Sequence, residues 1–180
     1  MNNISHTKIV SYQADWPKRF EIEKENLRHI FGNKALEIEH IGSTAIPGLS
    51  SKDIVDIGVV IENYKDADSF TEPLKQLGYK SHSIGAERHF YTKGNPIKYH
   101  VSIAYAKRGG FLPRQITFRD YLRNHPETRD EYEKLKIDLL KKDPTGGNEY
   151  IIGKGDFIQN ILRLAEWKDQ TYEEWIFKKQ

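Results

Sequence analysis

The stretch Ile38–Ile61, IEHIGSTAIPGLSSKDIVDIGVVI, constrains the fold more than any other part of this chain. It begins as a strand, breaks at Gly42-Ser43, crosses a loop of small residues and returns to an apolar strand that carries one acid, Asp56. A Gly-Ser turn with free backbone N–H groups, followed by a strand that presents a carboxylate, is typical of a phosphate or metal site. The stretch therefore predicts both a strand–turn–strand unit and a pocket beside it.

Asp56 is the strongest single signal in this stretch. It interrupts the strand Ile54–Ile61, which is mostly apolar on both faces, as central strands are. A buried Asp needs a partner, a metal or a changed protonation state, although an Asp at the beginning of a strand can also be solvated. Asp53 has the opposite parity unless it precedes the regular strand or lies on a bulge, and Glu62 lies about 20 Å along the strand, too far to share a metal with Asp56. We therefore expect one usable carboxylate here.

The composition indicates one soluble globular domain. With 180 residues, 37% of them hydrophobic and 30% charged, the chain can bury a core beneath a polar surface. A net charge of +2 gives no reason to expect nucleic acid, and the absence of cysteine excludes disulfides and Cys-ligated zinc. The first residues lack the apolar core of a signal peptide, and no apolar run approaches the ~20 residues of a membrane helix. We expect a cytoplasmic protein of open oligomeric state that stays out of membranes.

Hydrophobic periodicity predicts an α/β fold with a mixed sheet flanked by helices. The predicted strands are Leu36–Ile41, Ile54–Ile61, Tyr79–Ser83, and a hairpin of Arg88–Thr92 with Ile97–Tyr105. The predicted helices are Trp16–Phe31 with Asp15 as N-cap, one capped by Asp66 or Asp68 and ended by Gly78, Ile116–Asn124, Pro126 to about Lys142, and one capped by Asp156. Residues 1–180 form a single predicted domain, sheet-rich over 1–110 and helical over 111–180.

His100 is the second residue that could carry chemistry. It shares a strand face with Lys98 and Ser102. If that strand neighbours Ile54–Ile61, His100 and Asp56 converge as metal ligands or as an acid/base pair. A lone strand histidine is as often a hydrogen-bonded structural residue, so both interpretations stay open.

Several cations could hold a phosphate. Lys154 lies in Ile152-Gly-Lys-Gly-Asp156, just ahead of a predicted helix, which is a suitable place for an anion. The spacing of a Walker A loop is missing. Arg88, Lys98 and Arg119 are further candidates, although any single Arg or Lys is usually solvated surface.

The run Glu39-His-Ile-Gly-Ser-Thr-Ala-Ile-Pro-Gly48, followed by Lys52 and Val55-Asp-Ile57, closely resembles the GrpB family. The similarity covers most of the chain, including Tyr99-His100-Val101 and the segment from Phe118 to Pro126. The resemblance implies a nucleotidyltransferase-like fold. In active members of that superfamily the Gly-Ser turn contacts a nucleoside triphosphate, and strand carboxylates hold a divalent metal such as Mg²⁺ or Mn²⁺.

Carried over to this chain, the resemblance implies phosphate binding by Gly42 and Ser43 and a first metal-binding carboxylate at Asp56. The second carboxylate would fall at position 58, where this chain has Gly58. A GrpB strand often reads His-x-His, and here Lys98 takes the first of those places, which favours binding an anion over a histidine-based metal site.

Three hypotheses follow. The first is a nucleotidyltransferase-like protein that binds a nucleotide or similar phosphorylated small molecule, with Asp56 and His100 as catalytic or metal-binding groups and Arg88, Lys98 and Lys154 neutralising charge. The second is a non-catalytic binding or regulatory module on a degenerate transferase fold. The third is metal-independent acid/base chemistry by His100 with Asp56 or Glu87.

Overall fold

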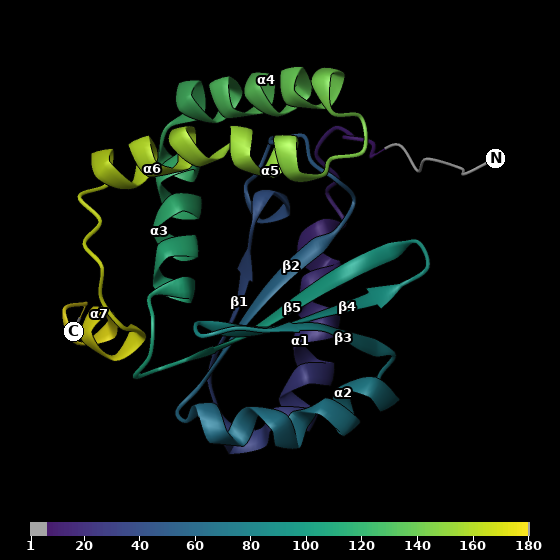
Figure 1. Ribbon diagram of the computed structural model, residues 1–180, viewed down its shortest axis with the longest axis vertical. Coiled ribbons are helices and arrows are strands. Elements are labelled where there is room, and N and C mark those ends of the chain that lie inside the picture. The colour runs from purple at the N-terminus through teal and green to yellow at the C-terminus, as the bar shows by residue number, and fades with distance from the viewer. Residues whose placement is uncertain (1–6, 180) are drawn as a thin grey trace.

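A five-stranded mixed sheet forms the centre of the computed structural model, which describes residues 7–179 (Figure 1). The strands are β1 (Ala35–Ile41), β2 (Val55–Ile61), β3 (Tyr79–Ile84), β4 (Arg88–Gly94) and β5 (Ile97–Tyr105). Their order in the sheet is β1-β2-β5-β4-β3. β2 and β5 run parallel, and every other neighbouring pair is antiparallel.

Helices surround this sheet. The α-helices are α1 (Trp16–Phe31), α2 (Thr71–Gln76), α3 (Phe111–Asn124), α4 (Pro126–Lys142), α5 (Asn148–Gly153), α6 (Gly155–Leu164) and α7 (Tyr172–Phe177). Three short 3-10 helices are η1 (Gly32–Lys34), η2 (Ser43–Ala45) and η3 (Tyr64–Phe70). None of the helices within residues 7–179 is long and apolar enough to cross a membrane.

One face of the sheet is covered by α1 and α2. Side chains alternate along β2 and β5, so Ile57 and Ile103 point to this face and pack with Trp16 and Leu27 of α1 and Leu74 of α2. All five side chains are almost completely buried. Burying one such side chain is worth about 1.5–3 kcal/mol, so this face holds the principal core.

The opposite face carries α3, and through it the rest of the C-terminal helices. Val60 of β2 and Ile41 of β1 pack with Leu112 of α3. A third cluster joins the loop residues Ile46 and Leu49 to α3, α4 and α6. Figure 1 shows α4, α5 and α6 together at one end of the molecule and α2 at the other. The helices α3, α4 and α6 thus pack against the loop that follows β1.

Most predicted elements are confirmed, and the helix Trp16–Phe31 has the predicted bounds. Asp15 precedes it without a side-chain capping bond. The helix predicted after Asp66 or Asp68 is present as α2, but it begins only at Thr71, because residues Tyr64–Phe70 form the 3-10 helix η3. Ala67 and Phe70 both reach the core, and a 3-10 helix aligns residues three apart.

The C-terminal end also differs from the prediction. The helix predicted from Asp156 is present as α6, a short additional helix, α5, precedes it, and Lys154 stands between them at the N-cap of α6. Asp156 lies within the first turn of α6 instead of capping it. The last helix, α7, was not predicted; its six residues are too few for a clear periodicity, although Thr171 and Glu174 form a capping box at its start.

Candidate functional site

Asp56 and His100 meet in the middle of the sheet. The parallel register of β2 and β5 places them directly side by side. Nδ1 of His100 lies 2.8 Å from Oδ1 of Asp56. Both side chains are half-buried on the face that carries α3, so the convergence that the sequence left conditional is present.

Gly42 follows β1 immediately beside Asp56, since Ile41 and Asp56 are paired in the β1–β2 register. Its φ is +70°, in the left-handed region that favours glycine. A Cβ at this position would lie 2.5 Å from Oδ2 of Asp56. The turn therefore needs glycine for two reasons, its backbone conformation and the close approach of the carboxylate.

Gly42→Ala is expected to lower the free energy of unfolding by about 2 kcal/mol, because alanine is strained at positive φ and its methyl group displaces Asp56. Urea denaturation measures the effect. Gly155→Ala is the matched control, since a Cβ at Gly155 meets nothing within 4 Å. Equal stability of the two variants would contradict the proposed role of Gly42.

A cleft opens above this pair, between the sheet and the helices α3, α5 and α6. It consists of two connected cavities of about 400 Å³ and about 350 Å³. Five residues line both cavities: Ser43, Asp56, Arg88, Ile151 and Lys154. Of the sequence-predicted residues, the structure thus gathers Gly42, Ser43, Asp56, Arg88, His100 and Lys154 around one cleft.

Arg88 crosses the cleft from β4. Its Nη1 donates to Oγ of Ser102 at 2.6 Å. The guanidinium carbon lies 4.6 Å from the ring centre of Phe90 and 4.7 Å from that of Phe111. Burial lowers the pKa of Arg88, partly offset by Asp56 and Glu87. Aromatic faces hold the side chain in place without neutralising its charge.

Two lysines share the ring of Tyr150 on the opposite wall. Nζ of Lys154 lies 4.3 Å and Nζ of Lys52 lies 4.7 Å from the ring centre. Burial and the neighbouring Lys52 lower the pKa of Lys154 to about 8. Burial also lowers the pKa of Lys52, against the pull of Asp56 and Asp143.

Lys136 lies behind the Gly-Ser turn and is only 2% exposed. Its Nζ donates to the carbonyl of Ser50 at 2.5 Å and lies 3.4 Å from Oγ of Ser43. Burial lowers its pKa to about 7. This lysine and Lys52 are the functional candidates that sequence reasoning missed. The available signal for Lys136 was its place on the apolar face of α4, four residues after the buried Tyr132.

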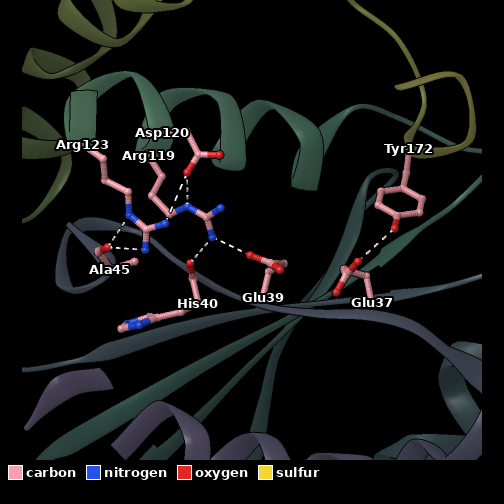
Figure 2. Close-up of polar contacts among 8 residues, drawn as sticks. All are labelled: Glu37, Glu39, His40, Ala45, Arg119, Asp120, Arg123 and Tyr172. Carbon is pink, nitrogen blue, oxygen red and sulfur yellow. Dashed lines mark hydrogen bonds and ion pairs between the residues drawn. The ribbon is translucent and has the colours of Figure 1, made fainter. Parts of the chain in front are cut away.

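Arginines of α3 fix the turn from above (Figure 2). Arg123 donates from Nε and Nη2 to the carbonyl of Ala45, at 2.9 and 2.7 Å. Arg119 donates from Nη1 to Glu39 at 2.5 Å and to the carbonyl of His40 at 2.7 Å. Arg119, an anion-binding candidate from the sequence, is therefore engaged inside the protein and does not line the cleft.

Lys98 is the other predicted residue that the structure keeps away from the cleft. It lies one residue before the part of β5 that pairs with β2, and its Nζ is 2.5 Å from Asp53, which precedes β2. Burial alone would raise the pKa of Asp53, but hydrogen bonds from Lys98, Trp16 and Arg19 outweigh it and lower the pKa to about 2. Lys98 and Asp53 thus form a structural ion pair at the start of the strands.

Gly58 lies two residues beyond Asp56, where a second carboxylate would stand. A Cβ there would come within 2.3 Å of Cδ1 of Leu112 and 3.4 Å of Cδ1 of Ile41. Leu112 is fully buried. The place of the second acid is therefore filled by an apolar side chain of α3.

A divalent metal finds few ligands at this site. Within residues 7–179 there is no group of three His, Cys, Asp or Glu side chains that could hold a metal ion. Asp56 is the single carboxylate that lines both cavities, and its Oδ1 is engaged by His100. The described residues do not fit a two-metal centre, which needs several oxygens converging on ions about 4 Å apart.

The sheet order and the position of the cleft define a nucleotidyltransferase-like fold. The poly(U) polymerase Cid1, in a structure with Mg 3′-dATP bound, aligns with a TM-score of 0.51 over 74% of this chain and 42% of that one. The sequences are 14% identical, so this likeness concerns the fold alone.

The chain belongs to the GrpB family, whose model, described as GrpB protein, matches residues 6–164. The conserved protein GrpB from Enterococcus faecalis superimposes with a TM-score of 0.80 at 30% identity, covering 88% of this chain and 96% of that one. The UPF0157 protein YqkA of Bacillus subtilis is 35% identical over 89% of this chain but 48% of its own length. The chain thus spans about half the length of that relative.

Proposed function

We propose that this protein binds a nucleotide or similar phosphorylated small molecule in the cleft above Gly42-Ser43. One observation carries the proposal: the cations at the cleft outnumber its carboxylates. Four of them are Lys52, Arg88 and Lys154, which line the cavities, and Lys136, which lies behind Ser43; a fifth, Arg114, lines the larger cavity and pairs with Glu87. Among residues 7–179 none of the four forms an ion pair with a carboxylate. Buried charges are costly when unpaired, so a ligand with several negative charges would stabilise this arrangement.

The shape and the walls of the cleft support the same ligand class. Cavities of about 400 and 350 Å³ are in the usual range for small-molecule sites. Arg88 offers the planar donors that suit phosphate oxygens. Phe111, Phe118 and Ile151 supply apolar surface for the uncharged part of the ligand. Mg²⁺ or Mn²⁺ would enter as the metal of a nucleotide complex, with Asp56 as its one protein carboxylate.

Asp56 and His100 are the proposed reacting groups if the bound molecule is turned over. Asp56 fixes the imidazole through Nδ1, which leaves Nε2 of His100 to accept a proton from a hydroxyl or a water molecule. Such chemistry needs no metal, so the activity would survive EDTA and would be lost in His100→Ala.

A non-catalytic binding or regulatory module is the second candidate function. The position of Leu112 against Gly58 favours it specifically, because the second carboxylate of a metal-dependent transferase has no room. This candidate is supported if a nucleotide binds without metal and mass spectrometry detects no product after long incubation.

Binding is tested by thermal unfolding with nucleoside triphosphates, with and without Mg²⁺ or Mn²⁺. A ligand at 100 times its Kd stabilises the fold by about 2.7 kcal/mol, which is a rise in Tm of several degrees. Lys154→Ala is expected to weaken binding at least about tenfold, because it removes one charge-assisted contact. Lys134→Ala, an exposed change on α4, is the matched control. No shift with any nucleotide, or equal shifts in both variants, counts against the proposal.

Asp56→Asn separates the two ways of binding. If phosphate contacts the cations directly, removing the carboxylate strengthens binding, because the negative charges of Asp56 and the phosphate repel each other. If a metal bridges the phosphates to Asp56, the same change weakens binding in the presence of Mg²⁺. Isothermal titration with and without EDTA shows whether Asp56→Asn binds the nucleotide more tightly or more weakly than the wild type.

A further inference from the structure

A second hollow, which we call the C-terminal groove, lies beside the cleft. It has a volume of about 1060 Å³ and runs between α3, α6 and the segment 166–170. Arg114 and Gln159 line both the groove and the larger cavity of the cleft. The groove and the cleft are therefore neighbouring chambers that meet at these two side chains.

The groove is rich in positive charge. It is lined by four cations, Arg114, Arg163, Lys168 and Lys178, and by two carboxylates, Glu166 and Asp169. Arg114 pairs with Glu87 at 3.1 Å. Arg163 donates to the amide oxygen of Asn160 at 2.8 Å, and Lys178 to that of Gln170 at 2.7 Å. Arg163, Lys168 and Lys178 make no ion pair with any carboxylate of residues 7–179, so their charge is free for a ligand.

A strained turn shapes the far wall of the groove. Glu166 has φ +54°, the one positive value among the non-glycine residues of the described chain. The N–H of Trp167 bonds the carbonyl of Leu162 at 2.9 Å, and that of Glu166 bonds Arg163 at 3.1 Å, which is the Schellman pattern. Glycine usually occupies this position, so the backbone at Glu166 is strained. The turn brings Trp167 to the groove, where its ring packs against Gly110.

We propose that the C-terminal groove binds a second phosphorylated small molecule, next to the ligand of the cleft. The guanidinium of Arg163 and the amines of Lys168 and Lys178 hold its phosphate, and Trp167 supplies a flat apolar surface for the remainder. The groove is larger than the cleft and takes a molecule of nucleotide size. Joint binding of two neighbouring ligands rests on the proposed function. Binding to the C-terminal groove alone is argued only from the residues of the groove.

Calorimetric titration with inorganic pyrophosphate tests this proposal, together with intrinsic tryptophan fluorescence. The wild-type protein is expected to bind two pyrophosphates per chain, one of them with a change in fluorescence. The double variant Arg163→Ala/Lys168→Ala should lose that change and weaken this site at least tenfold. Trp167→Phe should abolish the fluorescence change but retain both sites. Lys65→Ala/Lys80→Ala removes the same charge from exposed positions outside both chambers and should behave as wild type.

A second double variant, Lys52→Ala/Lys154→Ala, disables the cleft. If it leaves one site and the groove variant leaves the other, both proposals hold. If the groove variant titrates like wild type, the groove proposal is overturned while the cleft proposal stands. If only one site exists and the groove variant removes it, the groove proposal holds and the proposed function fails. No binding in wild type overturns both.

Discussion

Gly58→Asp is expected to destabilise the fold by about 3–5 kcal/mol, although it completes the pair of strand carboxylates that active transferases carry. The new side chain would begin 2.3 Å from Cδ1 of Leu112 and 3.4 Å from Cδ1 of Ile41. Both neighbours are apolar and almost fully buried. The carboxylate would therefore be both overpacked and unpaired, and each effect is costly by itself.

Urea denaturation of three variants separates these two costs. Gly58→Ala introduces only the steric contact, and we expect a loss of about 1–3 kcal/mol. Gly58→Asp adds the buried charge. Gly58→Asp/Leu112→Ala makes room beside the acid and should recover part of the steric loss, since neighbouring substitutions are not additive. A Gly58→Asp protein as stable as wild type would contradict this account of Leu112.

The position of Leu112 also bears on catalysis. A second acid at position 58 needs a coordinated change on β2 and on α3, because the same volume cannot hold both side chains. Gain of metal-dependent nucleotidyl transfer in the double variant, but not in Gly58→Asp alone, would identify the fold as a transferase that lacks one ligand. If neither variant gains activity, the binding-module hypothesis is strengthened.

The parts of the site that lie within one strand or its direct neighbour could be predicted from the sequence. Parity alone gave Asp56 as the usable carboxylate, and a parallel β2–β5 register then brings His100 to it. The Gly42-Ser43 turn and Lys154 also lie at the cleft, as expected from local chemistry. These features depend on strand alternation and turn geometry, which a short stretch of sequence determines.

The parts that depend on packing between distant segments could not be predicted. Lys136 reaches Ser43 across 93 positions of the chain, and Arg123 reaches Ala45 across 78. A lysine on a charged amphipathic helix is most simply solvated, and the spacing of four residues from Tyr132 is the one local sign that Lys136 lies on the buried face. Lys98 shows the opposite error: it was expected to hold a phosphate, but the pairing of β5 with β2 begins one residue later and Lys98 forms an ion pair with Asp53.

The free protein is expected to become more stable as the pH rises from 7 toward 9, and its affinity for polyphosphate is expected to fall over the same range. Burial lowers the pKa of Lys136 from 10.5 to about 7 and that of Lys154 from 10.5 to about 8. Between these values the unfolded chain holds more protons than the folded one, so stability increases with pH. For Lys136 the full effect is on the order of 5 kcal/mol.

The affinity for a phosphorylated ligand depends on pH in the opposite direction to the stability of the free protein. A bound phosphate favours the charged amines, so the complex must take up the protons that the free protein has released. Above a pH of about 8 each such lysine lowers affinity by up to about tenfold per pH unit. Lys52, which faces the same chamber, adds to the effect, whereas Asp56 and Glu133 oppose it by favouring the protonated lysines.

Urea unfolding and pyrophosphate titrations between pH 6.5 and 9.5 measure the two trends on the same protein. Lys136→Met is the informative variant, because methionine fills a similar volume without a proton to lose. Its stability should depend less on pH than that of the wild type, and its affinity should be low throughout. A wild-type affinity independent of pH would mean that these amines do not contact the phosphate. If the stabilities of the wild type and Lys136→Met depended on pH in the same way, Lys136 would keep its charge in the folded protein. The cost of burying these amines and their ability to hold a phosphate are thus two consequences of one arrangement.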